Sequence, residues 1–276
     1  MQQLEANQQD PTLENIVLLA DRNTSVQQWS RPTVRLYRSA ILFHIENQRI
    51  AGIISSEDAA KFEKLLKSLK GRPGRSERTS AKKAKHANEL AIKRLAEKLD
   101  SSRSTVAVLA KRLFLSSVMV GLRPAEWFSA QLDDDKLVVK NGKSTNGRGT
   151  GEYRTIDLRT PVLMIDRQKI KFIENTLSII QAASSPDKSN AELMTDIRQV
   201  VRRCGITSGG RNITIYTARH QFSANMKAAG LSKREIANLM GHASPNTAST
   251  HYGRGVSGHQ SFRQRKAPGV VMENRT

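Results

Sequence analysis

Most of the chain shows the spacing of apolar residues that amphipathic helices require. Residues 31–45 and 55–69 each place an apolar side chain at every third or fourth position, which predicts two helices. Arg31-Pro32 can open the first, because proline is tolerated in the first turn, and Ser55-Ser56 can cap the second. The expected core positions are Val34, Tyr37, Ile41, Ile45, Ala59, Phe62, Leu66 and Leu69. Together these segments predict a small all-helical N-terminal domain over residues 1–70.

The region from residue 89 to residue 276 has a mixed pattern. Alternating residues at 136–140 and 153–158 predict two strands, and the Gly- and Asn-rich stretch between them is typical of a long hairpin loop. Ser232 and Glu235 form a capping box that opens a helix. The expected fold class is mainly α with a small antiparallel β-sheet, in an α+β domain. Helical spacing recurs at 89–99, 105–120, 168–183, 189–204, 217–230 and 232–240.

A basic segment separates the two regions. Residues 67–85 contain eight Lys or Arg residues and a single acid. Gly71, Pro73 and Gly74 interrupt any helix there. We interpret residues 71–88 as a basic interdomain linker. A charged run is ordinarily a solvated loop, but the charge of the whole chain favours a linker that follows phosphates.

That charge is strongly positive: 45 Lys and Arg against 25 Asp and Glu give +20. Such an imbalance favours a polyanionic partner, nucleic acid first and an anionic membrane surface second. A content of 38% hydrophobic residues excludes a wholly disordered basic tail. The single cysteine argues against a disulfide scaffold, and we find neither a membrane-spanning stretch nor a signal peptide. The candidate DNA-binding residues are Arg35, Arg38, Arg72, Arg75, Lys82 and Lys83.

Residues able to handle a phosphodiester gather in the C-terminal third. Arg219, His242 and Tyr252 lie within one predicted helical stretch, and His242 follows the glycine that ends a capped helix. In the transition state of phosphodiester cleavage, negative charge spreads over the non-bridging oxygens, and arginine and histidine donors can stabilise that charge. Tyrosine is a weak nucleophile at neutral pH because its pKa is about 10. Fixed cations can offset this by stabilising the charge that develops.

Three sequence boxes resemble the tyrosine recombinase (phage integrase) family. They are Gly-Leu-Arg-Pro-Ala-Glu at 121–126, Tyr-Thr-Ala-Arg-His at 216–220 and Leu-Met-Gly-His at 239–242. Tyr252 follows the last box by ten residues, where the family has its nucleophilic tyrosine after nine or so. The order and spacing of the boxes make the resemblance specific, and it covers about residues 103–255. Tyr216 stands where the family usually has His, so it can donate a hydrogen bond but brings no positive charge.

The resemblance implies a site-specific DNA recombinase that acts without metal, ATP or another cofactor. Tyr252 would attack a backbone phosphate and form a 3′-phosphotyrosyl bond, while Arg123, Arg219 and His242 hold the non-bridging oxygens. A lysine on the hairpin loop would protonate the leaving 5′-oxygen. Lys143 is favoured for this role, and Lys140 stays open. Tyr216 completes the candidate catalytic set, whereas His220 and Glu126 are interpreted as structural partners.

The resemblance also implies partners and an origin. The partners would be double-stranded DNA, further copies of the chain in a homotetramer on two recombination sites, and possible accessory DNA-bending proteins. The protein would lie in the cytoplasm, associated with the nucleoid, and would come from a bacterium, a phage or a mobile element. The domain at 89–276 would be catalytic, with a C-terminal tail that a neighbouring subunit could receive, and residues 1–70 would be its core-binding domain. Three alternatives remain open: a type IB topoisomerase, a catalytically impaired DNA-binding regulator and a basic membrane-surface protein. Asp133-Asp134-Asp135 is interpreted as a polar turn rather than a magnesium site.

Overall fold

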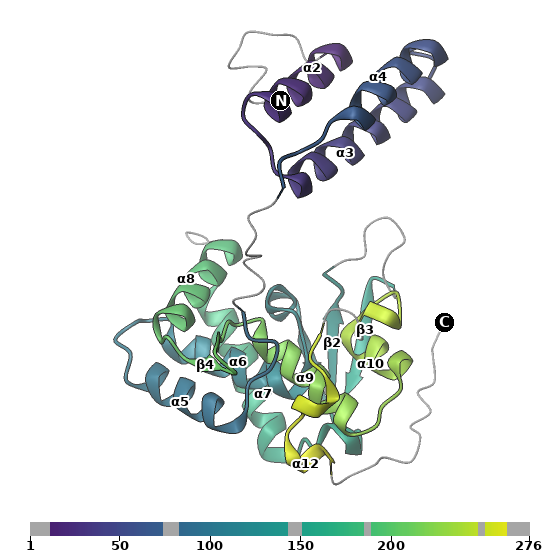
Figure 1. Ribbon diagram of the computed structural model, residues 1–276. Coiled ribbons are helices and arrows are strands. Elements are labelled where there is room, and N and C mark those ends of the chain that lie inside the picture. The colour runs from purple at the N-terminus through teal and green to yellow at the C-terminus, as the bar shows by residue number, and fades with distance from the viewer. Residues whose placement is uncertain (1–11, 74–82, 143–150, 185–188, 248–251, 264–276) are drawn as a thin grey trace. The chain divides into compact units, whose positions relative to one another are not determined.

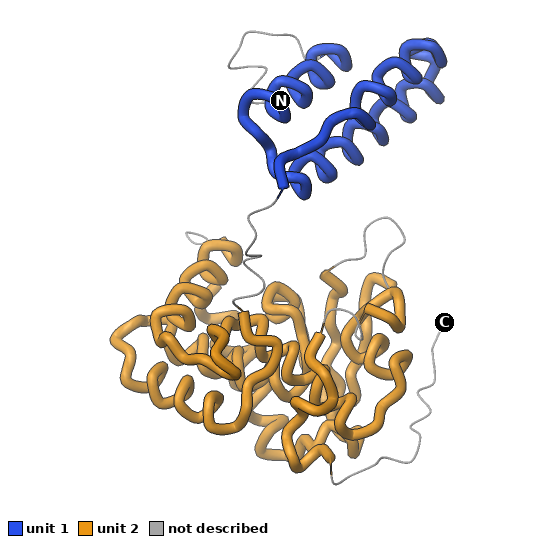
Figure 2. Tube along the Cα trace, in the orientation of Figure 1, with its two compact units in different colours: residues 1–79 blue, residues 80–276 orange. Residues whose placement is uncertain are grey.

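The computed structural model describes residues 12–73, 83–142, 151–184, 189–247 and 252–263. The chain divides into two compact units, residues 1–79 and residues 80–276 (Figure 2). Each unit has its own cluster of buried apolar side chains. Each therefore has the apolar core that a domain requires.

The described part of the first unit is helical. The side chains of Thr12, Ser30 and Ser55 each accept a hydrogen bond from a backbone N–H in the first turn of the following helix, so all three helices begin at a capping residue. Helices α3 and α4 lie side by side (Figure 1), and α2 contacts both. The last two helices were predicted, and α2 was not. The helices are α2 (Leu13–Ser25), α3 (Arg31–Ile50) and α4 (Ser56–Ser68).

Tyr37 corrects one expectation about this core. We predicted it as a core residue, but its side chain is 47% exposed and stacks on Trp29, with ring centroids 4.4 Å apart. The buried face of α3 is centred on Val34, Ile41 and Ile45, and Tyr37 lies at the margin of that face. At such a margin a tyrosine can pack its ring while its hydroxyl stays in water.

The second unit is built around helix α6, which is apolar on most of its surface. Helices α5, α7, α8 and α9 all contact α6, as expected for a helix with a wide apolar surface. Helix α10 contacts α9 and the neighbouring sheet (Figure 1). The described α-helices of this unit are α5 (Glu89–Asp100), α6 (Ala107–Val120), α7 (Arg167–Ala183), α8 (Asn190–Arg203), α9 (Thr217–Ala228), α10 (Lys233–Met240) and α12 (Gln260–Arg263).

The sheet of the second unit is small and antiparallel. Its order is β1-β2-β3, with Lys140 of β2 opposite Tyr153 of β3. Two very short strands, β4 and β5, form a separate hairpin. This confirms the predicted class, mainly α with a small antiparallel sheet, although β1, β4 and β5 were too short to predict. The strands are β1 (Gln131–Asp133), β2 (Lys136–Lys140), β3 (Tyr153–Asp157), β4 (Thr207–Ser208) and β5 (Arg211–Asn212).

The described ends of the basic segment are attached to different units. The backbone N–H of Arg72 donates to the carbonyl of Trp29 at 2.9 Å, within the first unit. The backbone N–H of Ala84 donates to the carbonyl of Asn212 at 2.9 Å, and Ala87 is buried in the second core. The central part, with Arg75 and Lys82, lies outside the described residues.

Candidate active site

The end of helix α6 begins the site. Gly121 ends this helix with φ +71°, and a Cβ atom there would lie 2.2 Å from the ring of Phe222 on α9. Only glycine meets both demands, because other residues rarely adopt this backbone conformation. The chain then turns into the short 3-10 helix η2 (Pro124–Phe128), which Arg123 precedes. The close approach of α6 and α9 brings the first two sequence boxes together.

Arg219 on α9 is fully buried and ties the boxes to one another. Its Nη1 donates to the carbonyl of Gly121, and its Nη2 donates to the carbonyl of Met240 at 2.6 Å. The Nε atom donates to the hydroxyl of Tyr252 at 3.2 Å. Buried carbonyls at helix ends need hydrogen-bond donors. This one side chain supplies donors at the ends of α6 and α10 and also contacts the candidate nucleophile.

His242 is held in a defined protonation state. It follows Gly241, which ends α10 with φ +61°, and its Nε2 lies 2.9 Å from Nη2 of Arg219. Burial, followed by the charges of Arg219, Arg123 and Arg154, lowers the pKa of His242 to about 3. The imidazole is therefore neutral at physiological pH. Because Nε2 accepts from Arg219, the proton resides on Nδ1, which is buried and has no hydrogen-bond partner among the described residues.

Tyr252 faces a second tyrosine. Its hydroxyl lies 2.7 Å from the hydroxyl of Tyr216, and its ring lies 5.0 Å from the rings of both His242 and His220. Burial and then the hydrogen bond to Tyr252 raise the pKa of Tyr216 to about 12, so Tyr216 is a neutral phenol at physiological pH. If Tyr252 became a phenolate, both Tyr216 and Arg219 could donate to its oxygen.

Glu126 is the carboxylate inside this cluster. Its oxygens accept from the backbone N–H of Arg123 at 2.7 Å and from Nη1 of the same residue at 2.5 Å. Nη2 of Arg123 also donates to the carbonyl of Gly241 at 3.3 Å. Burial raises the pKa of Glu126, but Arg154, Arg219 and Arg123 outweigh burial and lower it to about 2. Glu126 thus makes the contacts with backbone and arginine that we expected of a structural partner.

Arg154 and Asn141 belong to the cluster and were not predicted. Arg154 donates to both oxygens of Glu126, at 2.7 and 3.2 Å, and its Nε donates to the carbonyl of Leu239 at 3.2 Å. Its Nη1 also donates to Oδ1 of Asn141. The sequence does indicate that Arg154 points inward, because alternation along β3 places it on the same buried face as Ile156.

Other candidate residues lie elsewhere. Lys143 falls outside the described residues, while Lys140 is exposed on β2 and pairs with Glu152 at 3.4 Å. Arg35 is exposed and Arg38 half-buried on α3 of the first unit, and Lys83 is exposed in the second. The structure therefore brings together Arg123, Tyr216, Arg219, His242 and Tyr252.

Within the described residues, no three His, Cys, Asp or Glu side chains gather as a metal site. Asp134 and Asp135 form the turn between β1 and β2, and Asp135 pairs with Arg159. None of the helices in these parts of the chain is long and apolar enough to cross a membrane.

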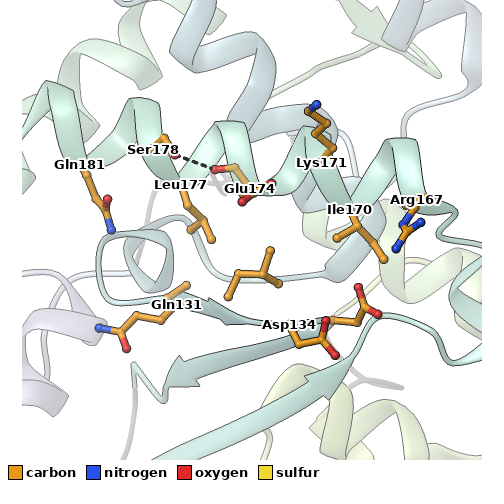
Figure 3. A pocket seen from close by; sticks show the side chains of 12 residues that line it. Gln131, Asp134, Arg167, Ile170, Lys171, Glu174, Leu177, Ser178 and Gln181 are labelled. Atoms are coloured by element: carbon orange, nitrogen blue, oxygen red, sulfur yellow. Dashed lines mark hydrogen bonds between the residues drawn. The ribbon is translucent and has the colours of Figure 1, made fainter.

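A groove of about 840 Å³ lies apart from this cluster, between α7 and the β1–β2 turn (Figure 3). Charged side chains such as Arg167, Lys171 and Glu174 line it beside Ile170 and Leu177. None of the clustered arginines, histidines or tyrosines lines it. The groove is therefore separate from the cluster that holds the candidate catalytic residues.

The protein is thus mainly helical, with three arginines around one buried carboxylate and one of them, Arg219, in contact with Tyr252. Comparison with protein families gives its class. The phage integrase family model matches residues 85–255, which includes every clustered residue. The chain belongs to the phage integrase family, the tyrosine recombinases. A comparison with curated protein sequences finds no match.

Solved structures share the fold. A lambda integrase tetramer bound to a Holliday junction is 15% identical, with a TM-score of 0.51 over 96% of this chain and 68% of that one. A lambda integrase (75-356) dimer bound to a COC′ core site is 16% identical, with a TM-score of 0.50 over 96% of this chain and 84% of that one.

The pKa of His242 predicts an unusual dependence of stability on pH. Its pKa is about 3 in the folded protein against an ordinary value of 6.5. Between these two pH values His242 is therefore protonated in the unfolded chain but neutral in the folded chain. Stability should therefore fall as the pH drops from about 6.5 towards 3, by up to about 1.4 kcal/mol per pH unit for each such proton. The melting temperature measured between pH 7 and 5 should decrease less steeply in His242→Gln. Equal slopes in the wild-type protein and in His242→Gln would contradict the prediction.

Proposed function

We propose that the protein is a site-specific DNA recombinase that cleaves and rejoins DNA through Tyr252. The Tyr252 oxygen forms a bond to a backbone phosphorus as its hydroxyl proton is lost to water, and the bond from phosphorus to the 5′-oxygen breaks. This leaves a 3′-phosphotyrosyl linkage and a 5′-hydroxyl. One observation carries the proposal: the Tyr252 hydroxyl lies at once against Nε of Arg219, 3.2 Å away, and the Tyr216 hydroxyl, 2.7 Å away.

The proposed chemistry needs no metal or ATP. The number of phosphoester bonds does not change, so the attack of a 5′-hydroxyl on the phosphotyrosine reverses the step. Arg123, Arg219 and the neutral His242 supply donors for the non-bridging oxygens, where charge develops. The proton for the leaving 5′-oxygen would come from Lys143, with Lys140 as the other candidate on this hairpin.

We further propose that double-stranded DNA is bound by both units. The candidate contacts on the described residues, Arg35, Arg38, Arg72 and Lys83, would neutralise phosphates together with Arg75 and Lys82, and this gives salt-dependent affinity. The lambda integrase tetramer on a Holliday junction supports a homotetramer that joins two sites. The proposal also assigns a role to each part of the chain. The core-binding domain would be residues 1–70, the linker residues 71–88 and the catalytic domain residues 89–276. Accessory DNA-bending proteins, a cytoplasmic nucleoid location and an origin in a bacterium, phage or mobile element belong to it as well.

A nicked suicide substrate tests this function. The nick should let the short piece next to the cleaved bond diffuse away, so wild-type protein should remain covalently attached to DNA and shift on a denaturing gel. Sequencing the attached DNA would identify the target site. No covalent species on a library of random duplexes, at concentrations where binding is saturated, would overturn the proposal.

Tyr216 favours a second candidate, a catalytically impaired DNA-binding regulator. A tyrosine here brings no positive charge, and its hydroxyl already engages the candidate nucleophile at 2.7 Å. Such a regulator would bind DNA and leave no covalent species on the same substrate. A topoisomerase would instead relax supercoiled plasmid without joining two sites, so a relaxation assay separates the enzymatic alternatives.

A further inference from the structure

A buried carboxylate within a phosphate-binding cluster poses an electrostatic problem. The Glu126 side chain is 0% exposed and lies 2.5 Å from Nη1 of Arg123. It also lies 3.7 Å from Nη1 of Arg219. A carboxylate this close would offset the positive charge of the two arginines and repel an incoming phosphate, since charges are poorly screened in a buried site.

Arg154 supplies the charge that balances Glu126. Its side chain is 6% exposed, so it does not itself face solvent, and it contacts both carboxylate oxygens. Paired contacts of this kind are strong and fix the relative orientation of the two groups. With Arg154 present, three guanidinium groups surround one carboxylate, and the charges of Arg123 and Arg219 remain available to another anion.

The contacts of Arg154 also span three parts of the second unit. Through Glu126 it reaches η2, through the carbonyl of Leu239 it reaches the end of α10, and through Asn141 it reaches the β2–β3 hairpin. A Cβ atom on Gly241 would lie 2.8 Å from Nη1 of Arg154. The glycine before His242 thus packs directly against this guanidinium.

We infer that Arg154 is a positioning residue for strand cleavage: it balances and orients Glu126 so that Arg123 is held in place with its charge available to the scissile phosphate. This inference rests on the proposed function. Lysine could not fully replace Arg154, because an ammonium is a point charge without the planar fork that contacts two oxygens.

The test measures single-turnover cleavage of the suicide substrate at saturating protein. Arg154→Gln should cleave about 10- to 100-fold more slowly, the loss found when residues that orient ligands at metal centres are changed. Arg154→Lys should fall between this variant and wild type. DNA affinity should change much less than the cleavage rate, because Arg154 acts on a single phosphate site while many other basic residues supply the affinity. Arg198→Gln removes the same charge from an exposed position on α8 and should cleave at the wild-type rate.

A double variant separates charge balance from general structural support. Glu126→Gln combined with Arg154→Gln removes one charge of each sign, so the net charge of the cluster equals that of wild type. This protein should cleave faster than Arg154→Gln alone, although two ionic contacts have been lost. A merely structural role would make the double variant as slow as the single variant, or slower.

Three results would overturn the inference. They are a wild-type cleavage rate in folded Arg154→Gln, a loss no larger than the loss of folded protein, and a double variant no faster than the single one. If Arg154→Gln does not fold, Arg154→Lys takes its place, and a wild-type rate in that variant would also overturn it. Failure of wild-type protein to form any covalent species would instead count against the proposed function.

Discussion

Tyr252→Phe is expected to abolish covalent attachment of the protein to DNA while leaving DNA binding intact. The substitution removes only the hydroxyl oxygen that would bond to phosphorus. The ring can keep its neighbours, since the His242 ring lies 5.0 Å away and the guanidinium carbon of Arg219 lies 5.4 Å from the ring centroid. On a nicked suicide substrate the denaturing gel should show no shifted species, whereas a native gel should show the wild-type complex.

A matched substitution checks this result. Tyr153→Phe removes the same atom from an exposed position on β3, and it should leave attachment unchanged. If Tyr252→Phe still becomes attached, the nucleophile is a different residue. Tyr216 would then be the first to examine, because its hydroxyl lies 2.7 Å from that of Tyr252, and peptide mapping of the adduct would identify it.

Arg219→Gln should have the second largest effect, with cleavage reduced at least about 10²-fold, the usual loss for one transition-state donor. Glutamine cannot supply the Nε donor that reaches Tyr252 or the charge beside it. The melting temperature should also fall, because the buried carbonyls of Gly121 and Met240 lose their donor. A buried acceptor without a partner costs about 1–3 kcal/mol.

The two effects of Arg219→Gln can be separated experimentally. Cleavage rates are compared at a temperature where circular dichroism shows the variant to be folded, and at saturating protein. Arg198→Gln, on an exposed position in the middle of α8, removes the same charge and should change neither the rate nor the melting temperature. A folded Arg219→Gln that cleaves within threefold of wild type would contradict the proposed role of Arg219.

The residues that the structure brings together could be predicted where the signal is local. Arg123, Arg219 and His242 each stand in a short box, and the boxes occur in a fixed order. Helix ends were equally local: the capping box of Ser232 and Glu235 opens α10 as predicted. In each case the signal lies within a few consecutive residues, so no knowledge of tertiary packing is needed.

The rest depends on tertiary contacts, which no short segment contains. Arg154 contacts Glu126 across 28 positions of sequence and Leu239 across 85. The strand pattern shows that Arg154 points inward but not what it meets. The neutral state of His242 likewise comes from burial and from arginines on three other elements. Tyr37 was misplaced because the helical period alone does not show where a buried face ends.

The arginines of the cluster also donate hydrogen bonds to carbonyls at helix ends. The same side chains would therefore serve both the proposed chemistry and the stability of the fold. Arg219 donates to the carbonyls of Gly121 and Met240, and Arg123 donates to that of Gly241. Mutations at these arginines would therefore impair the scaffold as well as any catalysis. Tyr252 carries no such burden, since its hydroxyl engages only side chains in the described contacts. A descendant that kept this fold for binding alone is thus expected to lose the tyrosine first and to retain the arginines.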